Sequence, residues 1–262
     1  MALPHIDLMY SVSGLAVGFL VGLTGVGGGS LMTPLLVLLF GVHPATAVGT
    51  DLLYAAATKS AGTLVHGLKG SVEWRITGRL AAGSVPAAAL TLWVLEHQGI
   101  HSRSATGLLQ HVLGTALLIT STALVFRPQL MRFAARTRRP PSAASTAILT
   151  ILTGVVLGVL VSLTSVGAGA IGVTVLLLLY PSLPTSRIVG SDIAHAVPLT
   201  LVAGMGHWLL GSVDWMMLLS LLIGSFPGIA LGSHLSARAP EALLRNLLAA
   251  VLVLIGVRLV VL

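Results

Sequence analysis

The chain has 262 residues, of which 55% are hydrophobic and only 8% are charged, and its mean hydropathy is +1.01. A soluble globular domain carries about 25% charged residues, so this composition excludes that class and indicates a single domain embedded in a lipid bilayer. The basic residues behind the net charge of +7 concentrate in loops, which is a topology signal and does not indicate a nucleic-acid partner. No cysteine is present, which excludes disulfides and thiolate metal sites.

Ten apolar segments follow one another along the chain, and we expect each of them to be helical. Two of them, 29–41 and 169–181, are shorter than the roughly 20 helical residues that a membrane span needs. Both directly follow a glycine-rich stretch, so we expect broken or re-entrant half-helices there, enclosed by protein or water. The ten segments cover approximately 8–23, 29–41, 46–66, 72–95, 104–127, 146–163, 169–181, 187–209, 213–235 and 241–262.

The two halves of the chain are copies of one unit. Residues 18–29 read GFLVGLTGVGGG and residues 158–169 read GVLVSLTSVGAG, with 8 of 12 positions identical. At an offset of 141, residues 49–86 match residues 190–227 at 13 of 38 positions. Glycine-interrupted repeats of this kind are typical of membrane transporters, which bind their substrate where the repeats meet.

A polar stretch at 128–145, with an arginine cluster and Pro140-Pro141, separates five apolar segments from five. We expect it to be a cytoplasmic linker between repeat one, residues 1–127, and repeat two, residues 146–262. The whole chain then forms one transmembrane transporter domain.

Loop charges indicate how the repeats are oriented. The loop that holds Lys69, Arg75 and Arg79 is basic, whereas its counterpart at 211–215 has no Lys or Arg. Because cytoplasmic loops are enriched in Lys and Arg, equivalent loops should lie on opposite sides of the membrane. We therefore expect an all-α polytopic membrane protein with two inverted repeats of about five helical segments each and both termini outside.

Three motifs carry a resemblance to a known family: GLTGVGGGSLMTPLL at 22–36, GVxPxxAVGT at 41–50, and HxxxGSVxW from His66. In this order, and partly repeated in the second copy, they resemble the TauE/SafE family of sulfite and organosulfonate exporters, which are TSUP-type permeases. The resemblance implies transport of an anion such as sulfite, thiosulfate, sulfoacetate or an arylsulfonate, and it does not fix which one.

The second copy departs from the family pattern, so we expect the two repeats to contribute unequally to the site. Ser165, Ala168 and Val173-Thr174 stand where the first copy has Gly25, Gly28 and Thr33-Pro34.

The two glycine-rich breaks are the candidate anion site. Consecutive glycines expose backbone N–H groups, and a half-helix that begins inside the membrane points its positive dipole end at the break. The alternative is that small residues only let helices pack closely; we favour packing for isolated glycines and binding for the consecutive ones. The expected substrate-binding residues are Gly25, Gly27, Gly28, Gly29, Ser30, Thr33, Thr50, Lys59, Val166, Gly167, Ala168, Gly169 and Ser191.

Charged residues inside the apolar segments are the candidate coupling groups. Asp51 and Asp192 occupy the same repeat position, and an intramembrane carboxylate costs about 2.5–3.5 kcal/mol on insertion scales, so each needs a partner or a task. We expect Asp51, Asp192 and His195 to handle protons, with a helix-capping role as the alternative for Asp51. Lys59, whose repeat counterpart is Thr200, is expected to add positive charge at the anion site; snorkelling is its alternative.

Further polar residues fall at segment ends. His66 and His207 are repeat-equivalent, and we expect each to cap the final carbonyls of its helix. Trp74 and Trp215 are expected to anchor at the membrane interface. Arg187 begins a segment, where it either snorkels or attracts anions.

The expected function is that of a multi-pass secondary transporter in the cell membrane, which moves a small sulfur-containing anion by alternating access as one repeat rocks against the other, with proton coupling. The chain contains no HExxH, no GxSxG and no P-loop, so we expect no enzyme activity and no cofactor. The alternatives are a cation or metal-ion permease that uses the paired aspartates, and a membrane scaffold. Substrate identity, direction, coupling ion and oligomeric state stay open, with a homodimer as one candidate assembly.

Overall fold

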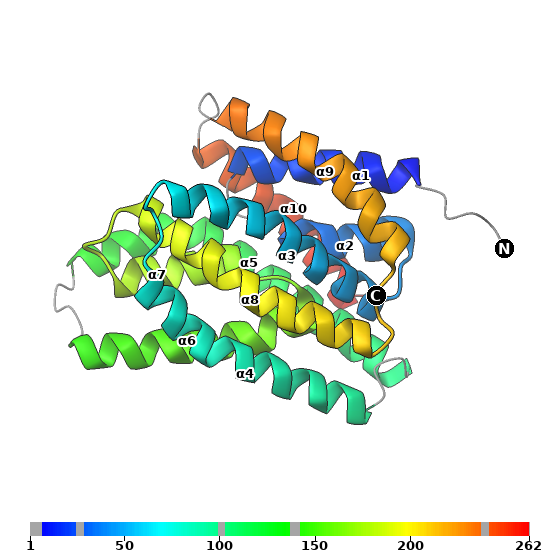
Figure 1. Cartoon of the computed structure of the whole chain (residues 1–262), viewed down its shortest axis with the longest axis horizontal. Helices are drawn as coiled ribbons and strands as arrows, with labels where there is room; N and C mark the ends of the chain where they lie inside the picture. The colour runs from blue at the N-terminus through cyan, green and yellow to red at the C-terminus, as the bar shows by residue number, and fades with distance from the viewer. Residues whose placement is uncertain (1–6, 25–28, 99–102, 137–141, 237–240, 262) are drawn as a thin grey trace.

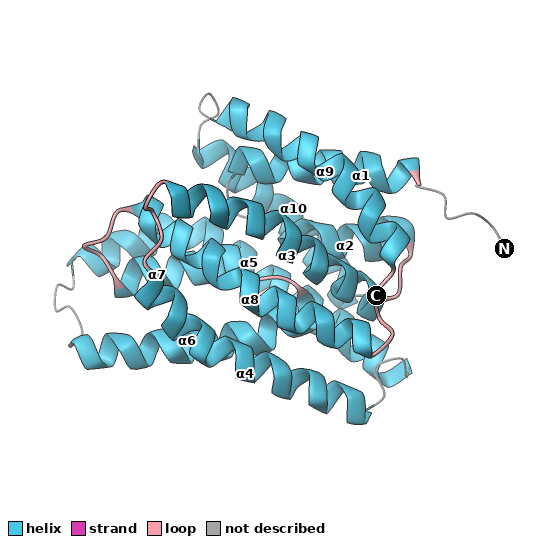
Figure 2. Cartoon of the chain, viewed as in Figure 1, coloured by secondary structure: helices cyan, strands magenta, loops and turns pink. Residues whose placement is uncertain are grey.

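The structure is a computed structural model, and it describes residues 7–24, 29–98, 103–136, 142–236 and 241–261. These residues form helices and loops with no strand, so the expected all-α fold is confirmed (Figure 2). The helices are α1 Leu8–Thr24, α2 Gly29–Phe40, α3 Pro44–Leu68, α4 Trp74–Gln98, α5 Arg103–Arg136, α6 Ala143–Thr164, the π-helical turn η1 Ala168–Gly172, α7 Val173–Leu179, α8 Thr185–Leu209, α9 Trp215–Ser236 and α10 Glu241–Val261.

Helix lengths and composition agree with a membrane protein. In the described part of the chain, five helices are long and apolar enough to cross a bilayer, while α1, α2 and the η1–α7 segment are apolar but shorter. The five cover Trp74–His97, Gly107–Leu130, Ala143–Thr164, Thr185–Leu209 and Trp215–Leu235.

Two helix boundaries differ from the expected ones. Helix α5 continues through Pro128 to Arg136, although the apolar pattern predicts that this segment ends one residue before the proline. An internal proline removes one backbone hydrogen bond and bends a helix, and the Gln, Leu, Met, Arg and Ala residues that follow it favour helix. Helix α3 begins at Pro44, because proline suits the first helical position and His43 Nδ1 accepts the Ala45 N–H at 3.3 Å.

The two repeats interleave. Helix α1 packs on α9 of the other repeat, and the counterparts of these two helices, α6 and α4, pack on each other in the same way. The equivalent helices α3 and α8 cross at the centre, and α5 packs on its equivalent, α10. Figure 1 shows the α1–α9 pair and the α4–α6 pair on opposite sides of the central α3–α8 pair.

Close backbone contacts define the direction of these pairs. Gly49 near the start of α3 lies against Ser212 beyond the end of α8, and the equivalent Gly190 lies against Ser71 beyond the end of α3. A Cβ atom at either glycine would overlap a backbone carbonyl oxygen of the partner, so the close approach requires glycine. Helices α3 and α8 therefore run antiparallel.

Helices α1 and α9 run parallel. Gly14 lies against Leu221 and Gly18 against Ser225, one turn further along both helices. These glycines stand one turn apart on a single helix face, and each would clash with the α9 backbone if it carried a Cβ. They carry the packing role that isolated glycines have in small-xxx-small contacts.

Candidate functional site

Three charged side chains are buried near the crossing of α3 and α8. Asp51 is 0% exposed, Asp192 1% and Lys59 8%, and among the described residues they are the only buried Asp, Glu, Lys or Arg. Asp51 lies about two turns inside α3, so it does not cap that helix. The Lys59 ammonium interacts electrostatically with both carboxylates, more strongly with Asp192 than with Asp51.

The Asp51 carboxylate is held by α2. The Thr33 hydroxyl donates to Asp51 Oδ2 at 2.6 Å, and the Thr33 backbone N–H donates to the same oxygen at 3.2 Å. The Ser165 side chain, just beyond the end of α6, also hydrogen-bonds to this carboxylate. The structure thus brings together two residues that the sequence predicted for the site, one from each side of the 41–43 turn.

The equivalent carboxylate in the second repeat has a different environment. Asp192 Oδ1 lies directly against Gly172, where a Cβ atom would overlap it, and no described group donates a hydrogen bond to this oxygen. Thr174 does not assist it, because its hydroxyl donates to the Ala170 carbonyl at 2.7 Å. The two aspartates are equivalent in sequence but lie in different surroundings.

Lys59 lines a cavity of about 350 Å³ between the α1–α9 pair and the α3–α8 pair. Neither Asp51 nor Asp192 lines it, and Lys59 is the only charged residue among its described walls apart from the titratable His66. The polar lining comes from Lys59, Thr58, His66 and Ser233, and the apolar lining from Val21, Ala61, Val65, Ile193, Phe226 and Ile229.

The repeat-equivalent region, between the α4–α6 pair and the α3–α8 pair, is packed. Thr200, the counterpart of Lys59, is 1% exposed, and its hydroxyl donates to the Ala196 carbonyl at 2.7 Å. Most counterparts of the other cavity residues are buried as well. The equivalent residues Leu52, Ala88, Leu92, Val161, Leu199, Ala203 and His207 are each at most 7% exposed.

The second glycine-rich stretch interrupts a helix as predicted. Helix α6 ends at Thr164, Ser165 has φ 59° and Gly167 has φ 116°, and the chain then continues as η1 and α7. The Thr164 hydroxyl accepts the Val166 N–H at 3.1 Å. Val166 and Ala168 are buried among side chains, and no residue of Val166–Gly169 lines the cavity. In this structure the interruption is enclosed by protein.

The first glycine-rich stretch is only partly described. Gly25, Gly27 and Gly28 lie outside the described residues. Gly29 and Ser30 begin α2, and Gly22, just before the stretch, lines the cavity. Their proposed backbone role stays a prediction.

Thr50 and Ser191 stabilise the starts of helices on the opposite repeat. The Thr50 hydroxyl accepts the Asp214 N–H at 3.0 Å, and the Ser191 hydroxyl accepts the Glu73 N–H at 2.8 Å. Asp214 and Glu73 directly precede α9 and α4, whose first N–H groups have no partner within their own helix. Both hydroxyls therefore form hydrogen bonds that connect the two repeats.

The histidines bond away from the aspartates. His195 Nε2 pairs with the Ser84 hydroxyl on α4 at 2.8 Å, and its Nδ1 has no partner among the described residues. His66 Nδ1 pairs with the Ser71 hydroxyl at 2.9 Å, and His207 Nε2 donates to the Ser162 carbonyl of α6 at 2.9 Å. The bonds of His66 and His207 differ from the expected ones, because neither goes to a final carbonyl of the histidine's own helix.

Polar and aromatic residues at the helix ends lie at the surface. Trp74 and Trp215 begin α4 and α9 with 64% and 46% exposure, as expected for interfacial anchors. Arg187 forms an ion pair with Glu73, so it joins α8 to the α3–α4 loop.

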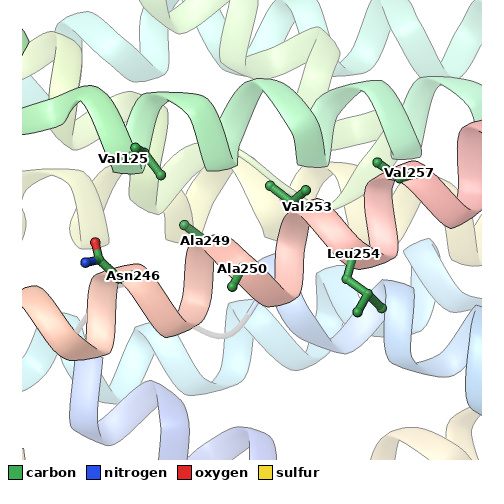
Figure 3. Close-up of a pocket in the computed structure, with 7 residues that line it drawn as sticks. All are labelled: Val125, Asn246, Ala249, Ala250, Val253, Leu254 and Val257. Atoms are coloured by element: carbon green, nitrogen blue, oxygen red, sulfur yellow. The ribbon is translucent and has the colours of Figure 1, made fainter.

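A second hollow, of about 670 Å³, lies between α5 and α10 (Figure 3). Asn246 is the only polar residue among its described lining residues, which also include Val125, Val253 and Val257. It offers no charge to an anion, so the Lys59 cavity is the candidate site.

Three residues of the Lys59 cavity, Thr58, Phe226 and Ser233, were not predicted from the sequence. Only the packing of α1 and α9 on α3 brings them next to Lys59.

Comparison with known proteins agrees with this architecture. The model of the family described as "Sulfite exporter TauE/SafE" matches residues 10–259. The chain is 38% identical to the probable membrane transporter protein YjnA of Bacillus subtilis, over 94% of this chain and 97% of that protein. It is 25% identical to the probable membrane transporter protein YdhB of the same organism, over 87% and 90% of the two chains, and 28% identical to a probable membrane transporter protein of Xylella fastidiosa, over 86% and 83%. No solved structure matches the chain significantly.

Proposed function

Because the chain belongs to the sulfite exporter TauE/SafE family, and is thus a multi-pass membrane transporter of the cell membrane, we propose that it carries a small sulfur-containing anion such as sulfite, thiosulfate or an organosulfonate. The observation that carries this proposal is Lys59. It is the only buried Lys or Arg among the described residues, and it lines the cavity between the α1–α9 pair and the α3–α8 pair.

A buried ammonium suits an anionic solute. Intramembrane charges are costly and mark substrate or ion pathways, and Lys59 interacts electrostatically with aspartates that lie outside the cavity wall. The volume of about 350 Å³ exceeds that of a few water molecules at about 30 Å³ each, so it holds a hydrated inorganic anion or an organic sulfonate. The apolar wall with Ile193 and Phe226 suits the carbon part of a sulfonate.

Transport by alternating access follows from the difference between the two equivalent regions. We propose that the repeats cross the membrane in opposite orientations, as the antiparallel α3–α8 pair suggests. The α1–α9 pair stands off the central helices and leaves the cavity, whereas the α4–α6 pair is closed on them. Exchange of these two arrangements would close the cavity and open the equivalent region at Thr200.

The moving bodies in this proposal differ from those expected from the sequence. The repeats interleave, since α1 packs mainly on α9 and α4 on α6, so we propose that these helix pairs, and not whole repeats, move as units. Each moving pair takes one helix from each repeat. The coupling groups Asp51, Asp192 and His195 stay a prediction, with Asp192 the carboxylate that interacts most strongly with Lys59.

A cation permease is the alternative. It would require carboxylates along the path, but the described walls of the cavity carry Lys59 and no Asp or Glu. This lining favours the anion.

The test is flux in proteoliposomes. Purified protein is reconstituted, and uptake of ³⁵S-labelled sulfite, thiosulfate and sulfoacetate is measured with and without a pH gradient, against protein-free vesicles. We expect saturable flux of at least one of these anions. Absence of flux for all of them, together with flux of Na⁺ or a divalent cation, would overturn the proposal.

A further inference from the structure

We propose that His66 is the gating residue of the Lys59 cavity: when the cavity closes, its imidazole leaves Ser71 and bonds the Gly22 carbonyl of α1. The repeat-equivalent His207 makes the opposite exchange at the same time. This inference rests on the transport function proposed above, because a gate has a task only in a protein that alternates between two arrangements.

The two equivalent histidines use different ring nitrogens. His207 Nε2 donates to the Ser162 carbonyl of α6 at 2.9 Å, and its Nδ1 has no partner among the described groups. His66 does the reverse, since its Nδ1 pairs with the Ser71 hydroxyl at 2.9 Å and no described group bonds to its Nε2. In the packed region the histidine therefore joins a central helix to an outer one, whereas beside the cavity it bonds within the end of its own helix.

The partner that His66 lacks lies across the cavity. Gly22 is the counterpart of Ser162, and each of them is the third residue from the end of its helix, α1 or α6. Carbonyls in the last turn of a helix have no partner within that helix, so they can accept a side-chain donor. His66 and Gly22 both line the cavity. The cavity thus separates two residues whose equivalents are bonded to each other.

A second pair of equivalent bonds is present on both sides. Tyr54 on α3 hydrogen-bonds Ser225 on α9, and their counterparts, His195 on α8 and Ser84 on α4, hydrogen-bond at 2.8 Å. Because this bond exists beside the cavity and in the packed region alike, it marks the point where each outer helix pair stays attached to the central helices. His66 lies about three turns further along α3 than Tyr54. The α1–α9 pair therefore swings about the Tyr54–Ser225 contact, and its far end closes on His66.

The side chains of the cavity wall have sizes that allow closure. In the packed region, Leu92 of α4 lies so close to Gly206 of α8 that a Cβ atom on this glycine would overlap it. The equivalent residues, Ser233 of α9 and Val65 of α3, both line the cavity. A small residue and a medium one thus replace a large residue and glycine, and the total volume is similar. Exchanges that conserve volume are the ones that packed interiors tolerate best.

The exchange keeps the number of bonds constant. In the structure, one histidine bonds a carbonyl of an outer helix and the other bonds a serine beyond its own helix. After the exchange His66 bonds Gly22, and His207 turns to Ser212, the counterpart of Ser71. One bond of each kind exists in both arrangements, so neither is strongly favoured, as a transporter that cycles between them requires.

The first experiment traps the closed cavity with a disulfide. The chain has no native cysteine, so the pair Val65→Cys and Ser233→Cys can be oxidised with copper phenanthroline in proteoliposomes without any transported anion. In the closed arrangement these two positions meet as Gly206 and Leu92 do, within the reach of a disulfide. The rate of disulfide formation then reports the population of the closed arrangement.

The two histidine variants should shift this rate in opposite directions. In the cysteine background, His66→Leu should slow disulfide formation about two- to tenfold, the effect of one lost hydrogen bond. The bond to Ser71 is half-exposed, so water replaces it, whereas the bond to Gly22 is buried on closure like that of His207, which is 0% exposed. His66→Gln keeps an N–H donor and should recover part of the rate. His207→Leu should raise the rate by a similar factor, because it releases the α4–α6 pair.

The control is His111→Leu. His111 is exposed on α5, outside the moving pairs, and bonds the Gly107 carbonyl of its own helix, so the rate should not change. An unchanged rate in His66→Leu, or a shift in the same direction in both histidine variants, would overturn the gate. Size-exclusion profiles check the assembly of each variant; if the buried His207→Leu does not assemble, the comparison of His66→Leu with His66→Gln decides.

The gate and the transport function can fail separately. Opposite shifts of the disulfide rate without flux of any sulfur anion would leave the gate standing and remove the proposed substrate class. Saturable flux of thiosulfate, combined with a disulfide rate that neither histidine affects, would do the reverse.

Discussion

Lys59 and Thr200 occupy the same position in the two repeats, yet they lie in opposite surroundings. Lys59 lines a cavity of about 350 Å³, whereas Thr200 is 1% exposed in a packed core. The sequence difference and the packing difference thus coincide at one pair of positions on the central helices. The positive charge stands in the region that is open, and the neutral residue in the region that is closed.

Replacing Lys59 should weaken anion binding. In Lys59→Ala we expect a loss of about 10- to 100-fold in anion affinity, since a charge-assisted hydrogen bond contributes about 1.5–3 kcal/mol. Lys59→Arg keeps the charge and should retain part of the flux. Binding and flux of labelled thiosulfate in proteoliposomes measure both. Lys69→Ala, at an exposed residue beyond the end of α3, is the control; wild-type affinity in Lys59→Ala would end the proposed role.

Cysteine accessibility should report the two arrangements of the helix pairs. The chain has no native cysteine, so single substitutions can be labelled directly. We expect Ile229→Cys, in the cavity wall, to react with a water-soluble maleimide in the state seen here. Ala88→Cys, its buried equivalent, should react only under transport conditions and from the opposite side of the membrane. Labelling of both from the same side would contradict the inverted arrangement.

Much of the fold could be predicted from the sequence, because apolar length and glycine-rich breaks are local signals. The interruption at Ser165–Gly167 was predicted from the repeat of GLT-type residues, and it lies where expected. The continuation of α5 through Pro128 was not predicted. A proline lowers the local preference for helix, and the sequence alone does not show whether the neighbouring helices accommodate the bend.

The site was less predictable than the fold. Burial of Asp51, Asp192 and Lys59 follows from their place in apolar segments, but the partners of each come from other helices. The Thr33 bond to Asp51 requires the turn between α2 and α3. Likewise, the hydroxyl of Ser191 was expected to bind substrate and instead accepts the Glu73 N–H, a contact between residues far apart in the sequence that no local pattern indicates.

The Thr33 hydroxyl should contribute to stability through Asp51. Thr33→Val removes a 2.6 Å bond to a buried carboxylate, and we expect a loss of about 1–3 kcal/mol in the free energy of unfolding. The control is Thr174→Val, which should cost less, because among the described groups the Thr174 hydroxyl bonds only the nearby Ala170 carbonyl. Unfolding in mixed detergent micelles gives both values, and equal losses would show that Thr33 acts only by packing.

Gly172 and Asp192 should be energetically coupled. A Cβ atom at Gly172 would overlap Asp192 Oδ1 and would also approach Leu157 Cδ1 at 3.3 Å. Replacing glycine by alanine inside a helix otherwise stabilises it by about 0.5–1 kcal/mol. A lower free energy of unfolding in Gly172→Ala would therefore report the clash, which we expect to cost about 1–3 kcal/mol. In the double variant with Asp192→Ala the loss should largely disappear, which gives a coupling energy above about 0.5 kcal/mol in a double-mutant cycle. Additive losses would mean that the carboxylate moves away from Gly172 without cost, and that the Asp192 position is not fixed by this contact.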